Sequence, residues 1–290
     1  MEYTTESLSE LILQIINNIL SKFFNSVDKT VYNLLDELTF IDENFLYQNN
    51  IEKIIGENSS NGILLICNAL LLGFFIFYGI QYLLSHLTYK QIQKPSQFIF
   101  KAIIFIGIMN SSFWMCQEFI YIISLITKAI NYLCEDLFNI TISFSEFISH
   151  LNTILYTENF ELDIFSFDGI IKSFSSIGML SLLFTYSLRY LLIQVFVIIC
   201  PFAILSLLSE STEYFFRAWI KNFFSLLLIQ ILLSIILLLG FSLINLSNIE
   251  IQKLLYIATI YAINKSNHII RELIGGISFE IKQALPFIKN

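Results

Sequence analysis

The chain has 290 residues, of which 56% are hydrophobic and only 13% are charged, and its mean hydropathy is +0.72. An ordinary soluble domain has about 25% charged residues, so this composition excludes a water-soluble globule and predicts a multi-pass membrane protein. The net charge of −7 excludes a cationic nucleic-acid-binding module, because such a module needs a basic face to displace phosphate counterions.

The predicted fold class is all-α: a polytopic membrane helical bundle with about five transmembrane helices plus amphipathic amino-terminal helices. Residues 1–60 carry apolar side chains at helical spacing from Leu8 to Val27, and they hold ten acidic and three basic residues. This pattern predicts an extracytoplasmic, amphipathic and acidic helical segment that lies on a membrane surface or on a partner.

Residues 61–128 are expected to form two transmembrane helices, 62–87 and 102–127, because each is an apolar run long enough to cross a bilayer. The loop between them holds three lysines: Lys90, Lys94 and Lys101. Basic residues in short loops favour the cytoplasm, so this loop is predicted to be cytoplasmic.

Residues 129–172 are expected to form an acidic extracytoplasmic loop. Residues 129–171 contain seven Asp or Glu and neither Lys nor Arg, which is the opposite of the preceding basic loop. The contrast between the two loops sets the predicted orientation, in which the amino terminus is outside the cytoplasm.

Residues 173–272 are predicted to be the transmembrane core, with three spans. The first part, Ser173–Ser209, is apolar except for Arg189, so it forms either one long helix or a tight hairpin that bends at Arg189. With one long helix, the spans of the core are 182–208, 222–247 and 251–272. We prefer this arrangement because it places Arg217 and Lys221 in a cytoplasmic loop, followed by a cytoplasmic tail at 273–290.

The sequence contains no HExxH, GxSxG or Walker motif, so we expect neither enzymatic activity nor a cofactor. The four cysteines form no CxxC pair, which predicts small buried residues and no metal site. Arg189 is the one charge deep in an apolar run. It either snorkels or marks a turn, or it faces a polar cavity or an acidic partner.

The stretch Arg189–Gln230 contains an Arg before an apolar run, a Pro-aromatic step, a Ser/Thr turn, an aromatic pair and a Trp that opens the next run. These residues are Arg189, Pro201, Phe202, Ser211, Thr212, Phe215, Phe216 and Trp219, and a glycine pair follows later at Gly275 and Gly276. The pattern resembles the TrbL-like or VirB-type polytopic inner-membrane subunit of conjugative type IV secretion systems, over about 90 residues. Glu213, Tyr214 and Ala218 depart from it, because the family commonly has basic residues after the Thr and a Gly before the Trp.

The resemblance implies a plasma (inner) membrane scaffold or channel subunit that contributes to the passage of DNA–protein or protein substrates. The implied partners are other membrane subunits and ATPases of the secretion complex, together with the lipid bilayer. Nucleic acid would be contacted only indirectly, and a homo-oligomer is a further alternative. The eight residues Arg189, Pro201, Phe202, Phe215, Phe216, Trp219, Gly275 and Gly276 are the candidates for structural and docking roles.

The alternative function is a small-solute transporter or permease. A carrier of this kind is favoured by paired ionisable residues at the membrane midplane or by an internal repeat, and neither pattern is evident in the sequence. A small pore-forming lysis or toxin-export protein is a third alternative, disfavoured by the long loops.

Overall fold

The computed structural model describes residues 12, 15–19, 22, 31–48, 50–56, 62–88, 94–155, 166–209, 211–245 and 248–274. These residues form helices joined by turns, which confirms the all-α fold class. The helices in chain order are residues 31–39, α2 (Phe45–Gln48), α3 (Ile51–Ile55), α4 (Ile63–Thr88), α5 (Pro95–Asn110), α6 (Ser112–Phe138), α7 (Phe144–Leu155), α8 (Phe167–Leu205), the 3-10 turn η1 (Ser206–Leu208), α9 (Glu213–Ser242), the 3-10 turn η2 (Leu243–Asn245) and α10 (Ile249–Ile274).

Four helices in the described part of the chain are long and apolar enough to cross a membrane: α4, α6, α8 with η1, and α9. The prediction of five spans is therefore wrong by one. The expected span 251–272 corresponds to α10, which carries Lys253 and Lys265 along its length and buries Tyr256 and Ile260 against the neighbouring helices. Such an amphipathic helix is stabilised by packing on one face, and it is not apolar all round as a lipid-facing span would be.

The expected span 102–127 is divided between two helices. α5 ends and α6 begins at Ser111, whose φ of −91° and ψ of 11° depart from the helical conformation. α5 has 16 residues, or about 24 Å of helix, which is shorter than a bilayer core of about 30 Å. The helix of membrane length is therefore α6, which begins at Ser112, within the predicted span, and ends at Phe138, beyond it.

α8 and η1 form one continuous rod of 42 residues, Phe167–Leu208. The preferred alternative, one long helix, is confirmed, and Arg189 marks no turn. The rod begins at Ser166, whose hydroxyl accepts a hydrogen bond from the Gly169 N–H and so caps the first turn. At 1.5 Å per residue the rod is about 63 Å long, about twice the thickness of a bilayer core.

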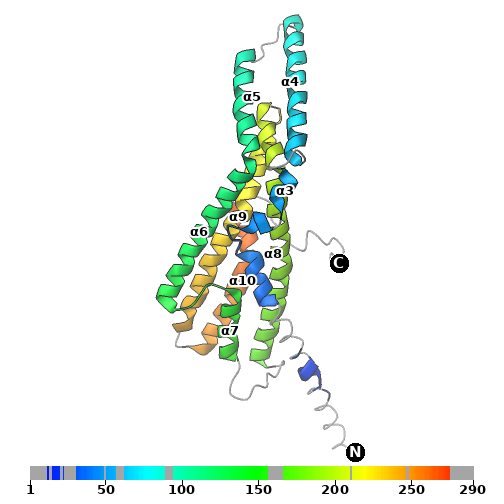
Figure 1. Cartoon of the computed structure of the whole chain (residues 1–290). Helices are drawn as coiled ribbons and strands as arrows, with labels where there is room; N and C mark the ends of the chain where they lie inside the picture. The colour runs from blue at the N-terminus through cyan, green and yellow to red at the C-terminus, as the bar shows by residue number, and fades with distance from the viewer. Residues whose placement is uncertain are drawn as a thin grey trace, which may run out of the picture.

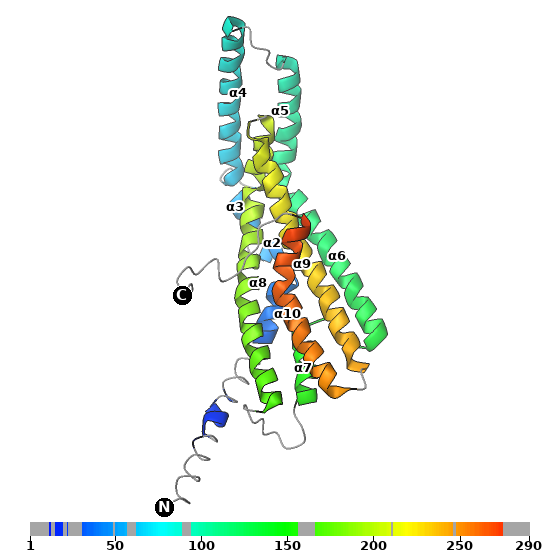
Figure 2. The same cartoon turned by 180° about the vertical axis from the view of Figure 1, so that it is seen from behind.

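The helices are arranged in two halves along one axis (Figure 1), as the view from behind also shows (Figure 2). α4 and α5 form one end, α7, α10 and most of α6 form the other, and α8 and α9 connect the two halves. Each half has its own buried apolar cluster, of which the first includes Leu71, Ala102 and Val197 and the second includes Phe147 and Ile260. α4 and α6 therefore lie at opposite ends, although each is long enough to cross a membrane.

The segment 129–172, expected to be a loop, is largely helical where the structure describes it. It contains the last turns of α6, the whole of α7 and the first turn of α8. Phe147 and Leu151 of α7 are fully buried in the second cluster. Cys134 is buried in α6, and the other three cysteines are also buried, as their apolar surroundings predict.

The amino-terminal region is partly packed within the bundle. The strap, which comprises residues 31–48 and 50–56, lies along α8 and α9 and contributes to both apolar clusters. Leu35 is buried in the second cluster, whereas Phe45 and Ile55 are buried in the first. The strap therefore covers the junction between the two halves of the molecule.

Asp36 joins the strap to α7. Its carboxylate accepts hydrogen bonds from the Phe144 N–H at 2.6 Å and from the N–H and hydroxyl of Ser145 at 3.2 and 2.8 Å. The cap of α7 is thus supplied by a residue far earlier in the chain. Burial raises the pKa of Asp36 above its ordinary value, and the hydrogen bonds from Phe144 and Ser145 oppose the rise.

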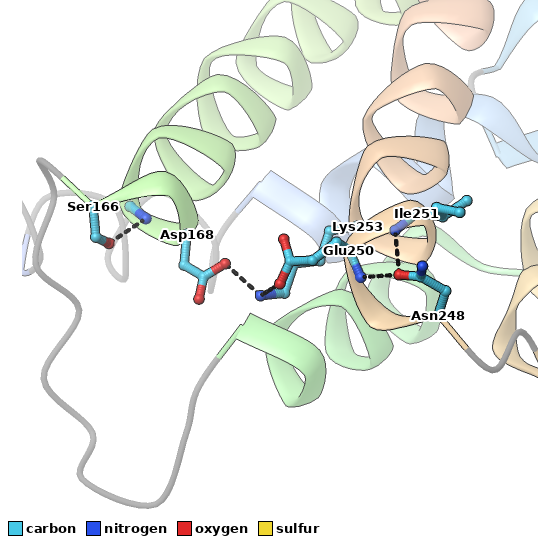
Figure 3. A network of polar contacts seen from close by, with 7 residues as sticks. Ser166, Asp168, Asn248, Glu250, Ile251 and Lys253 are labelled. Carbon is cyan, nitrogen blue, oxygen red and sulfur yellow. Dashed lines mark hydrogen bonds and ion pairs between the residues drawn. The ribbon is translucent and has the colours of Figure 1, made fainter.

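A polar network joins the first turns of α8 and α10 (Figure 3). The Lys253 ammonium lies 2.6 Å from the Asp168 carboxylate and 3.2 Å from Glu250, while the Asn248 side chain accepts hydrogen bonds from the first N–H groups of α10. Burial alone lowers the pKa of Lys253, but the hydrogen bonds and charges of the two carboxylates outweigh it, so the pKa is raised. The network joins the start of α10 to the start of α8, although the two helices are far apart in the sequence.

We expect Asp36→Ala to lower the free energy of unfolding by about 2 kcal/mol, because α7 then loses a cap that satisfies two of its N–H groups. Asp42→Ala is the matched control, since Asp42 is an exposed acid of the strap that bonds only the nearby Asn44 N–H. Unfolding in mixed detergent micelles measures both changes. Equal effects of the two substitutions would show that the link to α7 contributes nothing.

Candidate functional site

Arg189 lies near the centre of α8 and is fully buried. Its Nε donates a hydrogen bond to the Leu226 carbonyl of α9 at 2.8 Å, and its Nη1 donates to the Thr39 carbonyl of the strap at 3.0 Å. The guanidinium therefore joins three segments that are far apart in sequence. Of the sequence alternatives, neither snorkelling nor a turn describes this side chain.

Gln230 of α9 binds the strap two residues further on. Its Nε2 donates to the Ile41 carbonyl at 3.1 Å, and its Oε1 accepts from the Ile41 N–H at 3.2 Å. The amide side chain thus pairs with both main-chain groups of one residue, as a neighbouring β-strand would. Arg189 and Gln230 together form the main-chain clamp.

The clamp lies where the strap is not helical. The helix 31–39 ends at Thr39 and α2 begins at Phe45, which leaves main-chain groups between them without helical partners. An unpaired backbone group in apolar surroundings costs about 1–3 kcal/mol, so irregular backbone persists there only where side chains satisfy it. Arg189 and Gln230 supply three such hydrogen bonds.

The buried guanidinium is stabilised by carbonyl dipoles, because both of its hydrogen-bond acceptors are main-chain carbonyl oxygens. Two polar atoms at this contact, Arg189 Nη2 and Thr39 Oγ1, have no hydrogen-bond partner. Burial of a charge in this way is costly, and it stabilises the fold only through the groups that it binds. The arrangement holds the strap main chain and offers no acid or base for catalysis.

Apolar contacts of the strap flank the clamp. The Phe45 ring packs edge-on against the Tyr190 ring with 4.7 Å between centroids. Ile41, Leu46 and Ile51 are buried in the same cluster as the C-terminal part of α8. The clamp is thus a polar layer at the junction of the two apolar clusters.

The aromatic residues predicted near Trp219 lie close to the turn between α8 and α9 (the aromatic turn), away from the clamp. The Trp219 indole Nε1 donates to the Phe196 carbonyl of α8 at 2.8 Å, and its ring stacks on Phe216 and Phe223 with 5.8 and 5.2 Å between centroids. Trp219 is almost fully buried, so it fastens α9 to α8. Packing between helices therefore accounts for it better than a belt at the membrane interface does.

The remaining predicted residues lie near the clamp, near the turn between α8 and α9, or outside the described residues. Pro201 is buried within α8 and Phe202 is half-buried, whereas Phe215 has 40% of its surface exposed. Arg189 precedes Pro201 by 12 residues, or about 18 Å along a helix, so it belongs to the clamp and not to the aromatic turn. Gly275 and Gly276 lie outside the described residues.

Sequence reasoning missed Gln230, Thr39 and Ile41. A signal existed for Gln230, because it is the one amide residue between residues 223 and 244. No signal existed for Thr39 and Ile41, since they take part through main-chain atoms that every residue possesses.

No metal site is formed by the residues that the structure describes, because nowhere do three or more His, Cys, Asp or Glu side chains come together suitably. The Cys200 thiol of α8 donates a hydrogen bond to the Ser112 carbonyl of α6 at 4.0 Å, and Cys116 and Cys200 are both buried. They act as packing residues at this helix contact.

The chain was compared with models of known protein families, with curated proteins and with solved structures, and none of them matches.

We expect Gln230→Leu to lower the free energy of unfolding by about 3 kcal/mol, because the buried N–H and carbonyl of Ile41 both lose their partner. Gln117→Leu is the matched control: Gln117 makes an exposed hydrogen bond to Tyr47, and its loss should change stability by about 0.5 kcal/mol or less. Unfolding in mixed detergent micelles compares the two. A small effect of Gln230→Leu would mean that the clamp does not hold the strap.

Proposed function

We propose that this chain is an integral membrane scaffold or channel subunit of a type IV secretion machine, and that it helps to form the inner-membrane passage for protein or DNA–protein substrates. Other subunits of the machine supply the ATPase activity, and the chain itself is not an enzyme. The molecule supports the coarser part of this proposal directly, since it is a multi-pass helical protein with four candidate spans.

The observation that carries the proposal is the length of the apolar surface. The rod of α8 and η1 is about 63 Å long, whereas a bilayer core is about 30 Å thick. Large apolar side chains are exposed at both ends of the molecule, for example Leu83 and Leu87 on α4 and Phe167 and Ile170 on α8. One bilayer cannot cover all of this surface, so part of it must be covered by other protein.

The strap and α6 make two polar contacts at the surface. The Lys128 ammonium of α6 lies 3.6 Å from the Glu43 carboxylate of the strap, and about half of each side chain is exposed. Nearby, the Tyr47 hydroxyl donates to Gln117 at 2.8 Å on the surface. Charged groups at this place along a candidate span disfavour contact with lipid tails and favour water or a partner. We infer that the surface around these two contacts faces the passage.

A solute carrier is the weaker interpretation. A carrier needs a binding site between its own helices near the midplane. The one charge at the centre of α8, Arg189, is sealed against main-chain carbonyls, and the Glu43–Lys128 pair lies on the outer surface. Neither feature provides a cavity for a solute.

The orientation is part of the proposal. Lys94 and Lys101 lie on or next to α5, and Arg217 and Lys221 lie in the first turns of α9, at the end of the molecule that carries the aromatic turn. The positive-inside tendency favours the cytoplasm for this end. The aromatic turn would then face the cytoplasmic machinery.

We expect Trp219→Ala to leave the chain inserted and abundant but to reduce substrate transfer at least tenfold, because the turn between α8 and α9 loses both the indole hydrogen bond and the stacked rings. Trp114→Ala is the control, since Trp114 is the second tryptophan and is 58% exposed on α6. Transfer is measured at matched protein levels. Unchanged transfer by Trp219→Ala would contradict the docking role of Trp219, on which the resemblance to the secretion subunit chiefly depends.

We expect purification in mild detergent to retain other membrane subunits of the secretion complex, and removal of residues 1–30 to release some of them. The deletion stops at residue 30 because residues 31–56 belong to the packed bundle, so their loss would damage the fold itself. Deletion of residues 275–290 is the control at the other end of the chain. A solitary chain that transports a small solute in liposomes would favour the permease instead.

A further inference from the structure

Three cations gather beside the turn between α8 and α9. Arg217 and Lys221 lie four residues apart on α9, so they share one face of that helix. Lys101 lies on α5, which packs against η1 at this turn (Figures 1 and 2). Its ammonium lies 5.8 Å from the centre of the Phe105 ring, and it is close enough to Glu213 at the start of α9 to attract that carboxylate. Two helices from different parts of the chain therefore bring their positive charges to one place.

These cations are only partly neutralised by the protein. The Arg217 Nε and Nη2 donate to the same Glu213 oxygen at 3.2 and 2.8 Å, and Nη1 has no hydrogen-bond partner among the described residues. The Arg217 side chain is 72% exposed, and an ion pair this exposed contributes little to stability. Lys221 is exposed and pairs with no carboxylate in the described part of the chain. Arg217 and Lys221 can therefore bind an anion from outside the protein.

The cations lie where the uncharged part of α9 begins. The run Asn222–Ser242 has 21 residues without Asp, Glu, Lys or Arg, so it is about 32 Å long and matches a bilayer core of about 30 Å. Lys221 directly precedes this run and Arg217 lies one turn before it, which is the depth of lipid head groups. Next to the cations in sequence, Phe100 and Tyr214 are about 70% exposed. Exposed cations beside exposed apolar side chains complement an anionic head group above its acyl chains.

We propose that Lys101, Arg217 and Lys221 form a binding site for the phosphate of an anionic phospholipid, whose acyl chains lie in the bilayer core beside α9. The Arg217 Nη1 donates hydrogen bonds to the phosphate oxygens, and the two ammonium groups act as point charges. The site goes beyond the proposed function. It requires only that this multi-pass chain lies in a membrane, so it applies equally to a secretion subunit and to a carrier.

The test uses the full chain with Trp114→Phe, which leaves Trp219 as the one tryptophan, two residues from Arg217 on α9. The chain is reconstituted in neutral phosphatidylcholine vesicles. Phosphatidylglycerol or phosphatidylcholine with brominated acyl chains is then added in equal fractions, because bromine quenches indole fluorescence at close range. We expect the relative association constant of phosphatidylglycerol to be about fivefold that of phosphatidylcholine.

Arg217→Gln/Lys221→Gln should abolish this preference, and Lys101→Gln alone should lower it about twofold. The matched control is Lys53→Gln/Lys265→Gln, which removes the same charge from exposed positions on α3 and α10 and should keep the preference. All five side chains are exposed or half-buried, so the variants should fold.

Competition on the chain with an intact site identifies the ligand without these variants. Excess inorganic phosphate or a short single-stranded oligonucleotide should not displace the brominated phosphatidylglycerol, because neither has acyl chains. The proposal is overturned if the two lipids quench equally, if the two double variants behave alike, or if either soluble anion displaces the lipid. Since no substrate transfer is measured, the result is independent of the role in secretion.

Discussion

The fold depends on a polar layer placed between two apolar clusters. Arg189 and Gln230 project from the centres of the two longest helices and satisfy the main chain of the strap, at the point where its helix is interrupted. Without them the strap would bury unpaired carbonyl and N–H groups, which apolar surroundings do not tolerate. The layer therefore sets the position of the strap on α8 and α9, and through Asp36 it also sets the start of α7.

The position of this layer also bears on function. It lies where the two halves of the molecule meet, so the strap is the element that crosses the junction between α4 and α5 on one side and α7 and α10 on the other. A membrane protein that is longer than a bilayer is thick must keep its two halves aligned while each meets different surroundings. A continuous α8 and a strap clamped at its centre provide that alignment.

Uncharged runs predicted the helices that became α4 and α9, because a long apolar stretch has few alternatives to a helix. The same criterion failed for α10. Its charges lower its hydropathy below that of a span, and the burial of one face stabilises it as a helix. Arg189 could be singled out from sequence as a cation in apolar surroundings. Its partner could not, since the acceptor is a main-chain carbonyl of a residue 150 positions earlier and every residue offers one.

Recognition through the main chain constrains the sequences on the two sides of the contact unequally. Positions 39 and 41 can exchange their side chains among residues of suitable size and polarity and still present the same carbonyls and N–H, with proline excluded at 41 because it lacks the N–H. Positions 189 and 230 have no such freedom. Among descendants of this chain, Arg189 and Gln230 should stay constant while the side chains at positions 39 and 41 of the strap vary.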